Sequence, residues 1–172
     1  MDNDIEIKHK FEYNGNCYTI DYINASDIYN KIKEGQIEVQ KNQAKIPVIV
    51  SLTSYPRRIG KLYCTLYSII TQSVRPKSIV LWLAEEEFPH HESDLPDSLL
   101  LFQKYGLEIK WTHNIKSFKK IIYSLKEFGE YAVVTADDDV IYRRNWLELL
   151  YKAYLRHPHE ICAHRARECR AS

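Results

Sequence analysis

From residue 46 onward, short apolar runs alternate with segments in which apolar residues recur every three or four positions. Nearly continuous apolar runs are typical of parallel strands that are buried on both faces. The runs are IPVIVSLTSY (46–55), SIVLWLA (78–84), LEIKWTH (107–113) and YAVVTA (131–136), and EICAHRAR (160–167) is a candidate for a last strand. The intervening segments predict helices over residues 59–73, 98–106, 117–130 and 145–157. This alternation predicts an α/β sandwich with a mostly parallel central sheet.

The first 45 residues follow a different pattern and predict a small extension. Asn14 and Gly15 stand between two runs rich in aromatic and β-branched residues, which is a strong hairpin signal. Further along, Ile28, Tyr29 and Ile32 have helical spacing and predict a short helix before a polar linker. We therefore divide the chain into a hairpin and helix extension (1–45) and a core domain (46–172).

Composition and charge narrow the classes of partner. With 172 residues, 45% of them hydrophobic, the chain is long enough for one domain with a substantial core. Its 24 basic and 23 acidic residues give a net charge of +1, which argues against a nucleic-acid partner. The four cysteines lack metal-binding spacing and are expected to be free thiols.

The expected location is the cytoplasm, because the N-terminus has no signal-peptide pattern and no segment approaches about 18 consecutive apolar residues. A peripheral contact with the inner face of the membrane remains an alternative, since basic residues collect near the end of the chain and such residues attract anionic headgroups. They are Arg156, His157, His159, His164, Arg165, Arg167 and Arg170. Contact with a diphosphate is an equally open interpretation of the same cluster.

Asp137, Asp138 and Asp139 directly follow the apolar run YAVVTA. In open α/β sheets, ligands bind beyond the carboxyl ends of the strands, which is where these three aspartates are expected. Adjacent carboxylates repel one another, so the arrangement is best explained by a bound cation, and oxygen ligands favour Mg²⁺ or Mn²⁺. The alternative is ordinary turn chemistry, in which Asp137 starts a turn, Asp138 is solvated and Asp139 caps the next element.

An aspartate pair of the D-x-D type late in an α/β domain resembles the GT-A glycosyltransferases. The similarity runs from about Pro47 to Arg167, and four segments carry it. They are PVIVSLTSYPRRI, TLYSIITQSVRPKSIVLWLAEEEFP, SFKKIIYSL and VVTADDDVIYRRNWLELLYKAY, in that order. The chain is similar to the family-2-like bacterial enzymes of lipopolysaccharide and capsule assembly. This resemblance implies a GT-A (Rossmann-like) α/β/α sandwich.

The resemblance also implies roles for individual residues. Asp137 and Asp139 would hold the metal ion near the ribose-diphosphate region of a nucleotide-sugar, and Asp138 would contact ribose or sugar hydroxyls. Other nucleotide-sugar contacts are implied for Thr53, Ser54 and Tyr55 at the base, Arg57 or Arg58 at phosphate, and Lys119 and Lys120 at the diphosphate. The alternative for the hydroxyl residues is an ordinary strand end, and for the arginines a solvated turn. The alternative for the lysines is a solvated helix start.

The end of the second predicted strand departs from the family pattern. Many relatives have a base-contacting aspartate there, whereas this chain has LWLAEEEF. Glu85 or Glu86 would take that role, and Glu87 is expected to belong to a solvent-exposed acidic loop. The alternative is that all three glutamates belong to that loop.

Two functions follow from the resemblance. The first is transfer of a sugar from a UDP- or GDP-sugar to a glycan or lipid-linked acceptor, a precursor of a cell-surface glycan, with Mn²⁺ or Mg²⁺ as cofactor. The second is a non-catalytic module that lacks the acceptor half and serves in nucleotide-sugar binding or in interaction with a partner. Relatives carry their general base well downstream of the D-x-D aspartates, so we expect this chain to hold the donor-binding half and assign no catalytic base.

Overall fold

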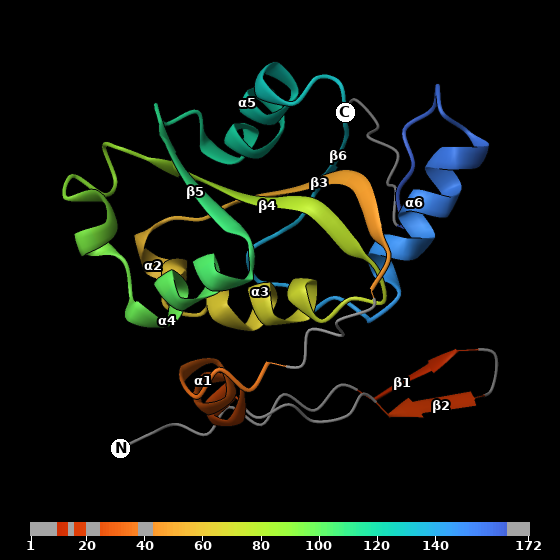
Figure 1. Cartoon of the computed structure of the whole chain (residues 1–172), viewed down its shortest axis with the longest axis horizontal. Helices are drawn as coiled ribbons and strands as arrows, with labels where there is room; N and C mark the ends of the chain where they lie inside the picture. The colour runs from red at the N-terminus through yellow and green to blue at the C-terminus, as the bar shows by residue number, and fades with distance from the viewer. Residues whose placement is uncertain (1–9, 14–15, 20–24, 38–42, 165–172) are drawn as a thin grey trace, which may run out of the picture.

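A computed structural model describes residues 10–13, 16–19, 25–37 and 43–164. Four parallel strands form the central sheet: β3 (Lys45–Thr53), β4 (Arg75–Ala84), β5 (Leu107–Thr112) and β6 (Ala132–Thr135). Their order across the sheet is β5-β4-β3-β6. All four predicted strands of the core domain are therefore confirmed, and the fold is a Rossmann-like α/β/α sandwich (Figure 1).

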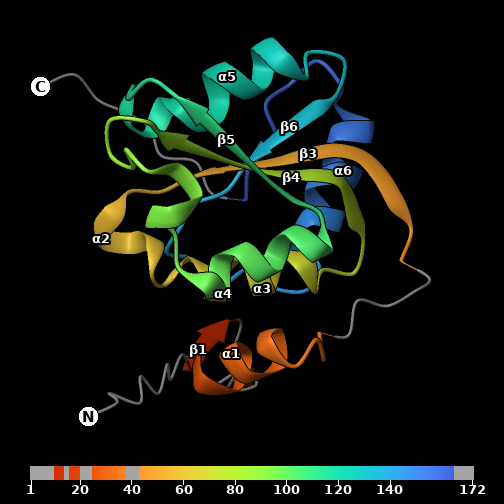
Figure 2. The ribbon, with the colours of Figure 1, turned by 60° about the vertical axis from the view of Figure 1, so that its left-hand side comes forward.

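Helices cover both faces of this sheet (Figure 2). Their bounds are α2 (Pro56–Ile59), α3 (Leu62–Ile70), α4 (Asp97–Leu100), α5 (Lys119–Glu127) and α6 (Trp146–Arg156). Short 3₁₀ turns are η1 (His91–Asp94), η2 (Leu101–Tyr105) and η3 (Lys116–Phe118). The views place α2, α3 and α4 on one face and α5 on the other. This distribution is expected when the connection that leads to β6 returns across the sheet.

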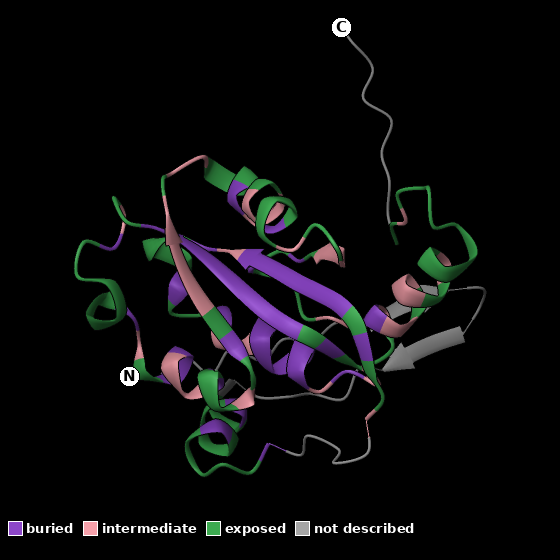
Figure 3. Cartoon of the chain, turned by 45° about the horizontal axis from the view of Figure 1, so that its top comes forward, coloured by how far each residue is buried: buried purple, intermediate pink, exposed green. Residues whose placement is uncertain are grey.

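Successive side chains along β3 and β4 point to opposite faces of the sheet and form two hydrophobic layers. Val48, Val50 and Leu52 belong to the large core cluster that includes α3, whereas Ile49 and Trp82 belong to a smaller cluster that includes side chains of α5 and β6. The middle of β3 and β4 is consequently buried from both sides, while β5 and β6 are less covered (Figure 3). A sheet of this kind is rigid at its centre and positions the residues that follow its strands.

The predicted N-terminal hairpin and helix are also present. Strands β1 (Lys10–Tyr13) and β2 (Asn16–Thr19) pair antiparallel, in a register that joins Tyr13 to Asn16. Helix α1 (Ala25–Lys33) lies against α3 and α4. Its Ile28 and Ile32 are buried in the large core cluster, so this helix packs on the domain.

Three predicted elements differ from those observed. The helix predicted over 59–73 is shorter, α3 over Leu62–Ile70, and a separate helix, α2, ends at Ile59. The helix predicted over 98–106 continues from α4 into the 3₁₀ turn η2. The last strand predicted over 160–167 is wrong for residues 160–164, since they follow a turn at the end of α6 and Ile161 is fully exposed. Residues 165–167 lie outside the described residues.

Candidate functional site

The chain changes direction across the sheet at β3. Strands β4 and β5 extend the sheet on one side of β3, and β6 then returns to pair with its other side. Such a topological switch point leaves a crevice beyond the carboxyl ends of the two adjacent strands. Here those ends are followed by Ser54 and Tyr55 after β3, and by the three aspartates after β6.

A cleft of about 620 Å³ lies at this point. We call it the charged cleft. Its lining residues are Thr53, Ser54, Tyr55, Arg58, Glu87, Asn114, Lys116, Ser117, Lys119, Lys120, Asp137, Asp138 and Asp139. Ligand sites in proteins typically have volumes of roughly 300–1,000 Å³, so the charged cleft is large enough for a nucleotide.

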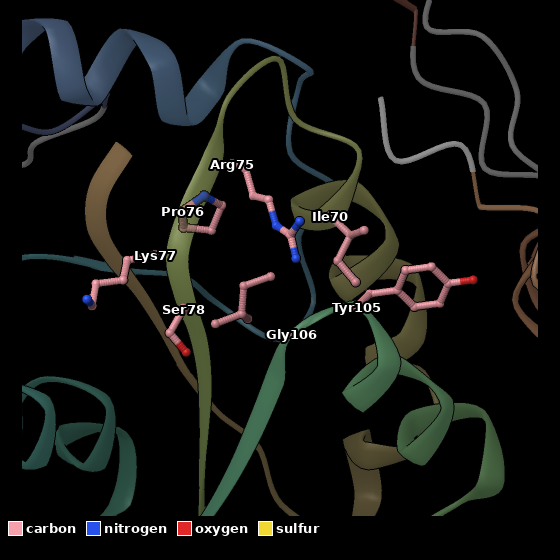
Figure 4. Close-up of a pocket in the computed structure, with 8 residues that line it drawn as sticks. Ile70, Arg75, Pro76, Lys77, Ser78, Tyr105 and Gly106 are labelled. Carbon is pink, nitrogen blue, oxygen red and sulfur yellow. The ribbon is translucent and has the colours of Figure 1, made fainter. Parts of the chain in front are cut away.

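A second, much smaller pocket of about 30 Å³ lies at the opposite end of the strands, where β4 and β5 begin (Figure 4). It is formed where β4 begins, at Arg75 and Pro76, and includes Ile70 at the end of α3 and Gly106 just before β5. A volume of about 30 Å³ is comparable to that of one water molecule, so this pocket is too small for an organic ligand.

Asp138 is an internal anchor of the charged cleft. Its side chain is only 8% exposed and accepts hydrogen bonds from the Ser54 hydroxyl at 2.7 Å and from Arg58 Nη1 at 2.9 Å. Its main-chain carbonyl oxygen accepts a further hydrogen bond from Thr65 of α3 at 3.0 Å. These contacts join the ends of β3 and β6 and exclude the solvated turn that is the alternative interpretation of Asp138.

Asp137 and Asp139 face solvent, in contrast to Asp138, and their side chains are 65% and 53% exposed. Asp137 is paired with Lys120, and its main-chain N–H donates to the Tyr142 hydroxyl at 2.7 Å. Asp139 lies 2.8 Å from Arg58 Nη1. The two outer aspartates are thus the accessible carboxylates of the cluster.

Arg58 places a positive charge between two carboxylates, because its Nη1 atom contacts both Asp138 and Asp139. The hydrogen bond with Asp138, followed by the charges of the two aspartates, raises the pKa of Arg58 above its usual value. Its guanidinium group also lies 5.5 Å from the centre of the Tyr55 ring. Of the two arginines expected near phosphate, Arg58 lines the charged cleft and Arg57 is absent from its lining.

The start of α5 forms the basic wall of the cleft. Lys119 is only 2% exposed and donates weak hydrogen bonds to Glu87 at 3.4 Å and Asn114 at 3.3 Å. Lys120 contacts Asp137 and donates to the carbonyl oxygen of Ala136 at 3.2 Å. A solvated helix start therefore does not describe these lysines.

The hydroxyl residues after β3 are engaged within the protein. Thr53 donates to the carbonyl oxygen of Trp82 at 2.8 Å, and Ser54 donates to Asp138. Tyr55, by contrast, is 39% exposed at the rim. Of the three residues expected at the base, Tyr55 is thus the one whose side chain is accessible for stacking.

The glutamates after β4 are arranged differently from the expectation. Glu85 is exposed and is absent from the cleft lining, whereas Glu87 is half-buried, lines the cleft and pairs with Lys119. The expectation that Glu87 belongs to a solvent-exposed loop is wrong, because the turn after β4 directs it toward α5. Glu86 accepts hydrogen bonds from main-chain N–H groups, its own and that of Asn114, which lower the pKa of Glu86.

Sequence reasoning missed Asn114, Lys116 and Ser117. Asn114 follows closely after β5, so the rule that ligands lie beyond the carboxyl ends of strands could have identified it. Lys116 has a positive φ of 59° and its N–H donates to the Asn114 side chain at 3.0 Å. A non-glycine residue in this conformation carries strain, which is common at functional sites.

The charged cleft has a donor set that fits a hard divalent cation bound together with a ligand. Within the described part of the chain, no group of three or more His, Cys, Asp or Glu side chains is arranged to hold a metal ion. Mg²⁺ is, however, usually bound by one or two carboxylates together with water and substrate phosphates. The exposed Asp137 and Asp139 match that lower requirement.

The basic cluster near the end of the chain lies apart from the charged cleft as far as it is described. Arg156, His157 and His159 are exposed, and His164 Nε2 lies 3.0 Å from the carbonyl oxygen of Trp146. Arg165, Arg167 and Arg170 lie outside the described residues. None of the helices in the described ranges is long and apolar enough to span a membrane.

The fold and the site together define an α/β protein with a charge-lined cleft at the topological switch point of a parallel sheet. No protein-family model matches the chain, and no curated protein matches it either.

Proposed function

We propose that the charged cleft binds the nucleotide-sugar donor of a metal-dependent glycosyltransferase of the GT-A type. The observation that carries the proposal is the position of Asp137 and Asp139, two exposed carboxylates at a topological switch point. They face a basic wall within a cleft large enough for a nucleotide. The acceptor would be a glycan or lipid-linked precursor.

In this proposal the acidic, basic and aromatic residues of the charged cleft bind different parts of the ligand. Asp137 and Asp139 hold Mn²⁺ or Mg²⁺, which, when bound, stabilises the negative charge that develops on the departing diphosphate. Arg58, Lys119 and Lys120 contact phosphate oxygens, to which charged donors bind strongly. Tyr55 offers an aromatic face to the base.

Calorimetric titration with UDP, GDP and CMP, each with and without Mn²⁺, tests the proposal directly. We expect one nucleotide to bind only in the presence of Mn²⁺, and Asp139→Asn to abolish that binding. Asp97→Asn, an exposed carboxylate outside the charged cleft, is the control and should bind as the wild type does. Absence of binding to all three nucleotides by the folded wild type would refute the proposal.

A second candidate, a module that binds a nucleotide-sugar without catalysis, is favoured by one observation. Every carboxylate that lines the described cleft is paired with a cation: Glu87 with Lys119, Asp137 with Lys120, and Asp138 and Asp139 with Arg58. A carboxylate that acts as general base must accept a proton from the acceptor hydroxyl, and a cationic partner weakens that ability. Release of nucleoside diphosphate from a nucleotide-sugar by this chain would exclude the second candidate.

A further inference from the structure

Two cations of the protein already pair with the three aspartates of the charged cleft and offset part of their negative charge. Arg58 Nη1 lies 2.9 Å from a carboxylate oxygen of Asp138 and 2.8 Å from one of Asp139, and Lys120 Nζ contacts Asp137. Each of the two proposed metal ligands therefore already has a cationic partner, Asp139 in Arg58 and Asp137 in Lys120.

The lining of the charged cleft is balanced in charge as a whole. Its acidic members are Glu87, Asp137, Asp138 and Asp139, and its basic members are Arg58, Lys116, Lys119 and Lys120. A diphosphate entering alone would add unbalanced negative charge, and a divalent cation alone would have to displace Arg58 or Lys120. A sugar-linked diphosphate and a divalent cation carry charges of opposite sign and similar magnitude. When both bind, the net charge of the cleft therefore stays close to zero.

We propose that Arg58 and Lys120 are exchangeable counter-ions, and that their release couples the binding of the divalent cation to the binding of the diphosphate. In the free protein they pair with the three aspartates and offset two of the three negative charges. When both ligands bind, the two side chains leave the carboxylates and turn to the phosphate oxygens. This inference rests on the proposed function and adds a rule for it: each ligand alone binds weakly, and each strengthens the other by the same factor.

The exposure of Arg58, and of Asp137, the partner of Lys120, permits this exchange: the Lys120 side chain itself is 17% exposed, but the Asp137 side chain that it would release is 65% exposed. Arg58 is 45% exposed and follows Pro56 on a single-turn helix, and Lys120 has a flexible four-carbon side chain. Asp138, in contrast, is held by the buried Ser54 hydroxyl, whose hydrogen bond remains after Arg58 has moved. The carboxylate cluster therefore keeps its geometry while its counter-ions are exchanged.

The test compares Mn²⁺ binding without nucleotide in the wild type, Arg58→Gln and Lys120→Met. Removal of an internal competitor should tighten the binding of Mn²⁺ alone by about two- to fivefold, the range that an exposed ion pair contributes. The same variants should bind UDP or GDP in the presence of Mn²⁺ about tenfold or more weakly, because a charged contact with phosphate is lost. A residue that served only to stabilise the fold would not shift these two affinities in opposite directions.

Two controls make the comparison specific. Arg57→Gln removes a neighbouring arginine that does not line the charged cleft, and Lys126→Met removes an exposed lysine from the same helix as Lys120. Both should bind Mn²⁺ and nucleotide as the wild type does. Circular dichroism and thermal unfolding verify that every variant is folded.

The outcomes separate this inference from the proposed function. If the wild type binds a nucleotide with Mn²⁺ but Arg58→Gln and Lys120→Met bind Mn²⁺ alone no more tightly, counter-ion exchange is refuted while the donor site stands. If the folded wild type binds none of UDP, GDP and CMP with Mn²⁺, the proposed function fails and the exchange fails with it.

Discussion

The three adjacent aspartates should differ sharply in what they contribute to stability, and Asp138→Ala is the informative change. It removes the acceptor of the Ser54 hydroxyl, which is 3% exposed and would be left unpaired in the interior. A buried polar group without a partner costs about 1–3 kcal/mol. The lost contact with Arg58 adds little, because Arg58 is 45% exposed and water replaces the carboxylate.

The expected result is a fall of about 1–3 kcal/mol in the free energy of unfolding for Asp138→Ala. Asp137→Ala should change that free energy by less than about 0.5 kcal/mol, because its side chain is 65% exposed. Urea unfolding followed by circular dichroism measures both variants, provided that the dependence on urea concentration stays the same.

Asp138→Asn is the matched control for the anchor. Its side-chain oxygen can still accept the Ser54 hydrogen bond, so its stability should lie between those of the wild type and Asp138→Ala. Equal stability of Asp138→Ala and Asp137→Ala would contradict the argument that Asp138 joins the ends of β3 and β6.

Three further predictions concern Ser124, Lys119 and Tyr142, of which Lys119 lines the charged cleft. Ser124→Ala removes the buried acceptor of Trp82 Nε1, 2.7 Å away, and should lower the free energy of unfolding by about 1–3 kcal/mol in urea, whereas an unchanged value would contradict the buried hydrogen bond. Lys119→Met should leave the free energy of unfolding unchanged or raise it, because a buried charge with weak partners is costly. The same change should weaken nucleotide binding in calorimetry about tenfold. Destabilisation without loss of affinity would contradict a ligand role for Lys119. Burial raises the pKa of Tyr142 from 10.0 to about 12, so the folded state holds this proton more tightly and its contribution to stability, complete below pH 10, is lost as pH rises through about 12. Thermal unfolding should show this loss in the wild type and a smaller one in Tyr142→Phe, and identical pH profiles would refute it.

The pattern of apolar residues was sufficient to predict the four strands of the central sheet and the N-terminal hairpin. A strand that is buried on both faces needs a continuous apolar run, so SIVLWLA can hardly be anything else. The candidate strand over 160–167 has a much shorter apolar run, residues 161–163, and is wrong for residues 160–164, because a strand also needs a neighbour to pair with. Strand pairing depends on the whole sheet, so the residues of a short segment do not determine it.

The aspartates show the same division within the candidate site. Their place after an apolar run identified the site, because ligands collect at the carboxyl ends of parallel strands. Which of the three is buried could not be predicted, since all three are chemically identical and the answer depends on Ser54 and Arg58, more than 70 residues away in the chain. Glu87 rather than Glu85 lines the cleft for a similar reason: the turn after β4 and the position of Lys119 decide it.

The sequence by itself determined the α/β class, the extents of the main strands and the position of the carboxylate cluster, because these depend on local periodicity and on composition. The tertiary structure alone decided that β6 lies beside β3, and therefore that a cleft forms there with Arg58 and Lys120 against the aspartates. Strand order follows from packing between segments far apart in the chain, where the energies of burial and pairing are summed over the whole domain. The sequence of a single segment therefore does not determine the strand order.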